Sequence, residues 1–82
     1  MKRHEWIQRD ETGTCHFRAT HHAGRWQMHI LRNEDEDWTL EDPISLEHLR
    51  VLRDVLMRKY QRRRVPFEHV EQLDKMIEAS AQ

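Results

Sequence analysis

"TCHFRATHHAGRWQMHI", residues 14–30, alternates apolar and polar side chains on both sides of a glycine, and this alternation decides the fold. Successive side chains of a β-strand point to opposite faces, so a period of two indicates half-buried strands. Gly24 stands between the two alternating runs, where a tight turn needs a residue that tolerates positive φ. The stretch therefore predicts a hairpin whose strands cover 14–21 and 26–32.

A third strand precedes this hairpin. "RHEWIQ", residues 3–8, alternates in the same way, and Gly13 supplies the turn that joins it to the next strand. A slip of one residue would move every apolar side chain to the other face, so the pattern also fixes the pairing. The predicted cross-strand pairs are Arg9 with Thr14, Trp6 with Phe17, His4 with Ala19, Phe17 with Ile30, Ala19 with Met28, and His21 with Trp26.

This pairing predicts a sheet over residues 3–32 with one apolar and one polar face. The apolar face carries Trp6, Phe17, Ala19, Trp26, Met28 and Ile30, with Cys15 beside them. The opposite face carries Arg3, Glu5, Ile7, His16, Arg18, Thr20, Gln27, His29 and Leu31. We expect this second face to be mostly exposed to solvent, because most of its side chains are polar.

The remaining chain predicts an acidic connector followed by two helices. Residues 33–44 hold six carboxylates, and we expect a loop with a short turn at "TLED" and Trp38 as its apolar anchor. Ser45 is a suitable N-cap for a helix over 45–63, and Pro66 suits the first turn of a second helix over 66–79.

Together these elements predict a single small α+β domain that spans all 82 residues in the order βββαα. We expect a three-stranded antiparallel meander with two C-terminal helices packed on one face. The first helix has a core stripe of Leu46, Leu49, Leu52, Leu56 and Tyr60, and the second has Phe67, Val70, Leu73 and Ile77. Val51 and Val55 lie on a separate flank of the first helix, which makes its apolar arc wide.

Composition narrows the class of protein. The chain has one cysteine and shows neither a signal-peptide pattern nor a long apolar run, so we expect a cytoplasmic protein without a membrane span. Its formal net charge is −1, so no global field favours nucleic acid, and any such attraction must come from a local cluster.

Four of the seven histidines fall within residues 14–30, which raises the question of a metal or catalytic site. Cys15 and His16 are adjacent in a strand and point to opposite faces, so they cannot act as a dyad. His16 and His29 share a face but only as diagonal neighbours, and no third ligand for zinc is evident. With two glycines, both used in turns, the chain has no phosphate-binding loop. We therefore expect no enzymatic activity, no metal and no cofactor.

One functional hypothesis is a small binding module that acts through protein contact. The partner would be another protein or a second copy of the chain. The candidate contact residues are Val51 and Val55 on the helix flank, with Ile7 and Leu31 on the polar face of the sheet. A three-stranded sheet also has open edges that could pair with another strand.

The alternative hypothesis is nucleic-acid binding. "RKYQRRR", residues 58–64, places five cations within seven positions, more than a helix end needs to balance its dipole. Such cations can bind phosphates regardless of base sequence. The candidate residues are Arg58, Lys59, Arg62, Arg63 and Arg64, extended by Arg18 on the polar face of the sheet.

Overall fold

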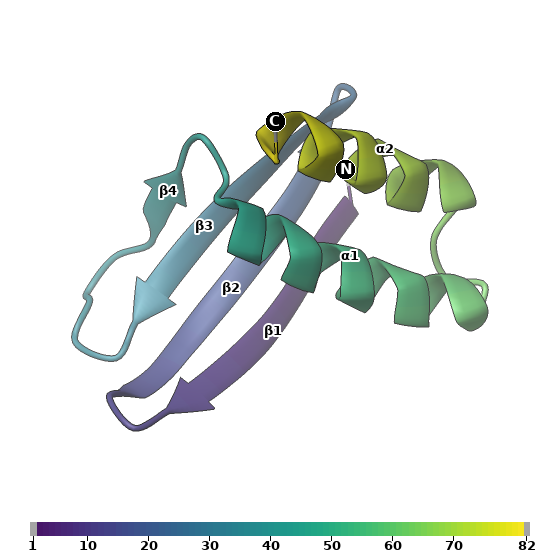
Figure 1. The fold of residues 1–82 in the computed structure, drawn as a ribbon. Coiled ribbons are helices and arrows are strands. Elements are labelled where there is room, and N and C mark those ends of the chain that lie inside the picture. The colour runs from purple at the N-terminus through teal and green to yellow at the C-terminus, as the bar shows by residue number, and fades with distance from the viewer. Residues whose placement is uncertain (1, 82) are drawn as a thin grey trace. The chain divides into compact units, whose positions relative to one another are not determined.

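A computed structural model describes residues 2–81, and the chain divides into two compact units (Figure 1). The sheet unit ends at Pro43 and the helical unit begins at Ile44. The α+β class and the order βββαα are confirmed, with one short strand added after the third. The elements are β1 (Lys2–Asp10), β2 (Gly13–His22), β3 (Arg25–Arg32), β4 (Thr39–Glu41), α1 (Leu46–Gln61) and α2 (Phe67–Ser80).

The strands form one antiparallel sheet in the order β1-β2-β3-β4, and the predicted register is confirmed. Trp6 pairs with Phe17, which pairs in turn with Ile30. The other four predicted pairs also form: Arg9 with Thr14, His4 with Ala19, Ala19 with Met28, and His21 with Trp26. Apolar alternation and the turn lengths agree on this register, so it is specified twice.

Burial separates the two faces of the sheet as predicted. Phe17, Ala19, Trp26, Met28 and Ile30 are buried on one face, which also holds the buried His4. On the other face, called the outer face below, Ile7 is exposed, whereas His16, Arg18 and His29 are half-buried. The outer face is therefore less solvated than the polar pattern predicts.

The acidic connector accounts for part of that difference. A turn at "TLED" was the wrong prediction, because Thr39–Glu41 is strand β4 and pairs with Met28–Ile30 of β3. Pairing satisfies backbone groups of β3 that would otherwise be left at the sheet edge. A strand of three residues is too short to show a period of two, so the sequence pattern could not reveal it.

The helical unit is an antiparallel pair in which α1 and α2 contact each other. Ser45 is the N-cap of α1, as predicted, and its hydroxyl accepts a hydrogen bond of 3.3 Å from the backbone N–H of His48. An ion pair between Arg53 of α1 and Asp74 of α2 joins the helices, and the Asp74 carboxylate raises the pKa of Arg53. Buried apolar residues of the unit are Leu49, Leu52, Leu56, Val65, Val70 and Leu73. Within residues 2–81, neither helix has the length and apolar content that crossing a membrane requires.

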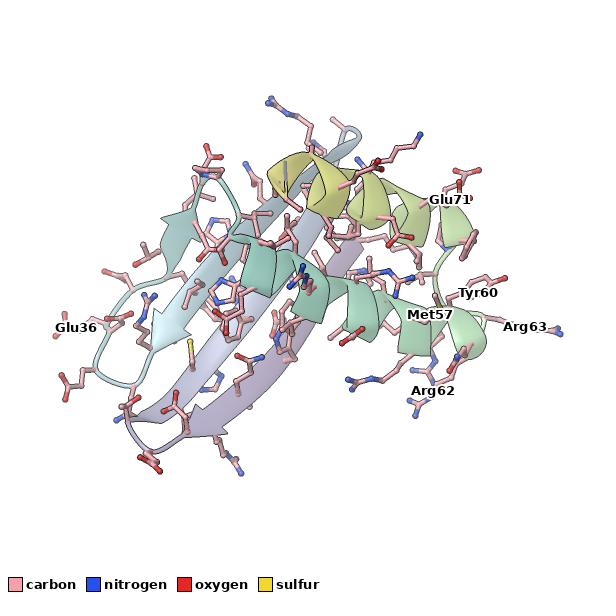
Figure 2. The ribbon with its side chains drawn as sticks, viewed as in Figure 1. Glu36, Met57, Tyr60, Arg62, Arg63 and Glu71 are labelled. Atoms are coloured by element: carbon pink, nitrogen blue, oxygen red, sulfur yellow. The ribbon has the colours of Figure 1, made fainter. Side chains whose placement is uncertain are left out.

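Tyr60 and Phe67 depart from the predicted core stripes. Both stripes were expected to be buried, yet the two rings are 40% and 43% exposed and contact each other with centroids 5.0 Å apart. They stand where α1 ends and α2 begins, at the turn between the helices (Figure 2 labels Tyr60). Helical periodicity identifies the side of a helix that faces the core, but not how far along the helix the core extends.

The hairpin turn between β2 and β3 offers a stability test. His22 pairs with Arg25, so Ala23 and Gly24 form a two-residue loop, with φ of 53° and 76°. Both values are positive, as in a type I′ turn, where asparagine and glycine are favoured and alanine is strained.

We expect Ala23→Asn to increase the free energy of unfolding by about 1 kcal/mol, because asparagine tolerates the left-handed conformation. Gly24→Ala should decrease it by about 1 kcal/mol. No atom lies within 4 Å of a Cβ built at Gly24, so the loss would come from the backbone and not from a clash. Urea denaturation measures both changes, and a stabilising Gly24→Ala would contradict the turn assignment.

Candidate functional site

The outer face of the sheet brings apolar and charged side chains into two rows across the strands. One row joins Ile7, His16 and Leu31, which are paired in register from β1 to β3. The next row joins Glu5, Arg18, His29 and Leu40 from β1 to β4. Side chains directly opposite each other in such rows are near enough to interact. These two rows and Trp38 are called the outer-face patch below.

Trp38 lies over this face and not out in solvent. The guanidinium carbon of Arg18 is 4.2 Å from the centroid of the Trp38 ring, which is a cation–π contact. The Nε of Arg18 also donates a hydrogen bond of 3.0 Å to the Oε1 of Glu5. Arg18 thus has one side covered by an indole and is paired with a carboxylate, which Arg3 shares at 3.8 Å.

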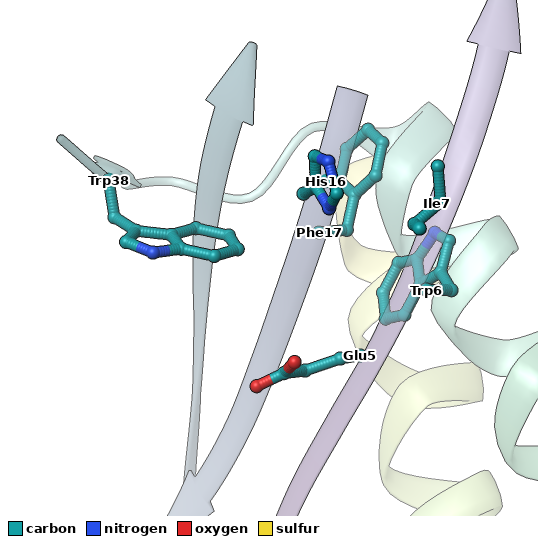
Figure 3. A pocket seen from close by; sticks show the side chains of 6 residues that line it. All are labelled: Glu5, Trp6, Ile7, His16, Phe17 and Trp38. Carbon is teal, nitrogen blue, oxygen red and sulfur yellow. The ribbon is translucent and has the colours of Figure 1, made fainter. Parts of the chain in front are cut away.

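A groove of about 320 Å³ opens on the outer face. Figure 3 shows Trp38 on one side of it and Ile7 on the other, with His16 between them. Glu5 supplies a carboxylate to the lining, and Trp6 and Phe17 of the adjoining strand segments complete it. The groove therefore combines two apolar walls with an acid and an imidazole.

The groove and the single thiol of the chain lie on different sides of β2. His16 faces it, but Cys15 lies on the opposite side of the same strand. Burial raises the pKa of the Cys15 thiol above its ordinary value of 9.0, and the nearby Arg32 opposes this effect only in part. A higher pKa leaves less reactive thiolate at neutral pH. Among residues 2–81, no three His, Cys, Asp or Glu side chains converge in a group that could hold a metal ion.

The residues that the sequence proposed for protein contact belong to two different units. Ile7 and Leu31 share a row on the outer face, where Ile7 is 50% exposed and Leu31 is half-buried. Val51 and Val55 belong to α1 in the other unit and are both half-buried. The apolar surface of the helix flank is therefore smaller than its sequence pattern predicts.

The proposed nucleic-acid residues also belong to two different units. Arg58, Arg62, Arg63 and Arg64 are exposed at the end of α1, and Lys59 is half-buried among them. Arg18 belongs to the sheet unit, where Glu5 and Trp38 already occupy its guanidinium. A phosphate would have to compete with Glu5 and Trp38 for Arg18, but not for the exposed arginines at the end of α1.

Sequence reasoning missed Glu5, Trp38 and Leu40 as members of the patch. Glu5 could have been found, because the predicted register already places it opposite Arg18. Leu40 and Trp38 carry no such signal, since their positions depend on the unrecognised strand β4. Comparison of the chain with protein-family models, curated proteins and solved structures gives no match.

The contact between Arg18 and Trp38 can be measured by a double-mutant cycle. We expect Arg18→Met and Trp38→Leu to be coupled by about 0.5–1 kcal/mol in the free energy of unfolding, the usual value for an exposed cation–π pair. Arg25→Met is a matched control, because Arg25 is an exposed arginine of the same sheet at the β2–β3 turn. Coupling of Trp38→Leu with Arg25→Met should be near zero. Equal coupling in both cycles would show that Trp38 does not contact Arg18 specifically.

Proposed function

We propose that this protein is a small non-enzymatic binding module that acts through protein contact, with the outer-face patch as its contact surface. The observation that carries the proposal is the exposure of large apolar side chains there, 50% for Ile7 and 48% for Leu40. Such side chains gain free energy when a partner removes them from water. The single cysteine fits a reducing compartment such as the cytoplasm.

The groove on the outer face can receive a side chain of a protein partner. Its volume of about 320 Å³ lies at the low end of small-molecule sites, which run from about 300 to 1,000 Å³. Such a groove has room for one apolar side chain of a partner, between the walls that Trp38 and Ile7 form. Glu5 and Arg18 at its side could bond to polar groups that flank the inserted side chain.

The face of the sheet is a better contact surface than its edge. β1 is a long strand at the end of the strand order, which could in principle pair with another strand. Five of its nine residues are charged: Lys2, Arg3, Glu5, Arg9 and Asp10. Charged side chains on an edge strand hinder pairing with a second edge. A second copy of the chain therefore remains a candidate partner through its outer face.

The proposal predicts that association depends on Ile7 and Leu40. We expect Ile7→Lys or Leu40→Lys to weaken binding about tenfold or more, since burial of such a side chain contributes about 1.5–3 kcal/mol. Glu47→Lys on α1 is the control, because Glu47 is exposed and lies outside the patch. Sedimentation velocity over a wide range of concentrations tests association of the chain with itself.

A photo-crosslinking residue at position 7 tests other partners in an extract of the source cells. A product of discrete mass should form from position 7, should disappear with Leu40→Lys, and should not form from position 47. Mass spectrometry then distinguishes a second copy from another protein. A chain that stays monomeric and gives no product specific to position 7 would overturn the proposal.

A further inference from the structure

The turn between the helices carries a second surface of different chemistry. The basic turn, residues 58–67, holds Arg58, Lys59, Tyr60, Arg62, Arg63, Arg64 and Phe67. Figure 2 shows Tyr60, Arg62 and Arg63 extending from the end of α1. Within residues 44–81, the guanidinium groups of the four arginines make no ion pair or hydrogen bond, whereas Arg53 is paired with Asp74. The charge of these four groups is available to an external anion.

Stabilisation of α1 accounts for only part of this cluster. Arg58 and Lys59 lie in the last turn of the helix, where cations interact favourably with its dipole. Arg62, Arg63 and Arg64 come after the final helical residue, Gln61. Because the dipole effect falls off away from the helix end, it gives less reason for Arg63 and Arg64 than for Arg58, Lys59 and the C-cap Arg62.

The charge of the chain is also divided unevenly between its two units. Residues 44–82 contain eight Lys or Arg and six Asp or Glu, and five of those eight cations lie in 58–64. Residues 1–43 contain six Lys or Arg and nine Asp or Glu. The overall charge is −1, but the helical unit has more cations than anions and therefore a local positive field.

The backbone of the turn places an arginine where glycine would be more stable. Arg63 has a φ of 59°, in the left-handed region. Its N–H donates to the carbonyl of Tyr60, and the N–H of Arg64 donates to that of Lys59, at 2.7 and 2.8 Å. This is a Schellman motif with Arg63 at the position that glycine usually occupies. Arginine at this position therefore costs stability relative to glycine.

Two exposed aromatic rings complete the surface. Tyr60 and Phe67 are 40% and 43% exposed, and their rings lie 5.0 Å apart at an angle of 47°. Exposed rings beside arginines are the combination that binds single strands, where bases stack on the rings and the cations bind phosphates. We propose that the basic turn binds single-stranded nucleic acid, with Tyr60 and Phe67 as the stacking platform and Arg62, Arg63 and Arg64 as phosphate ligands.

An acidic peptide is the main competitor for such a surface. Its carboxylates would bind the arginines alone, because a carboxylate has no aromatic face that could stack on Tyr60 or Phe67. The proposal differs from simple charge attraction in giving Tyr60 and Phe67 a share of the affinity. It also assigns no part to Arg18, whose guanidinium is held by Glu5 and Trp38.

Fluorescence anisotropy with labelled oligo(dT) and oligo(U) of about 15 nucleotides tests the proposal, at about 50 and about 200 mM salt. We expect the affinity to fall steeply with salt. Tyr60→Leu and Phe67→Leu should each weaken binding about fivefold or more at an unchanged salt slope. Arg63→Gly should reduce the salt slope by about 0.7 and weaken binding, yet raise the urea midpoint, because glycine suits the turn.

Arg50→Ala is the matched control, since Arg50 is an exposed arginine nearer the start of α1. Its affinity should stay within about twofold of the unmodified chain. A preference between oligo(dT) and oligo(U) would identify DNA or RNA as the natural strand, and equal binding would fit the shared chemistry of both. No binding at the lower salt would overturn the proposal. So would polyglutamate binding of equal strength together with unchanged affinity in Tyr60→Leu and Phe67→Leu.

Discussion

The register of the three long strands is the constraint on which the rest of the sheet depends. Phe17 pairs with both Trp6 and Ile30, and all three belong to the apolar face. Moving any one strand by a single residue would expose its apolar side chains and bury charged ones, at a cost of several kcal/mol. The same register sets the order of side chains on the outer face. The outer-face patch is thus a consequence of how the core is built.

The register could be predicted because independent features of the sequence agree on it. The turn glycines fix the loop lengths, and the apolar alternation fixes the faces. Strand β4 and the position of Trp38 could not be predicted, because three residues show no period and a contact with Arg18, twenty positions earlier, has no local pattern. A run of carboxylates is typical of a solvated loop, yet here the acidic connector contains strand β4.

Helical periodicity had a different limit. It correctly placed Leu49, Leu52 and Leu56 in the core, and it placed Tyr60 on the same stripe. The error at Tyr60 and Phe67 concerns position along the helix, since both rings are exposed where the two helices meet, although Val65 in the turn between them is buried. Tyr60 and Phe67, which depart from the predicted burial, lie next to Arg63 and Arg64, which exceed what the helix dipole explains. Departures from local rules that coincide in one place are expected at functional or strained sites.

The two candidate surfaces differ in whether their arginines have partners within the chain, and this difference decides which kind of partner each surface suits. On the outer-face patch, Arg18 donates to Glu5 and stacks on Trp38, so its guanidinium has partners within the chain. The same Glu5 oxygen also forms an ion pair of 3.8 Å with Arg3. A partner that buries the apolar side chains beside Arg18 therefore does not have to supply the first carboxylate for it. In the basic turn the guanidinium groups of Arg62, Arg63 and Arg64 have no such partner among residues 44–81. An anionic partner would balance their charge. The basic turn therefore suits an anion, whereas the outer-face patch suits a partner with an apolar surface.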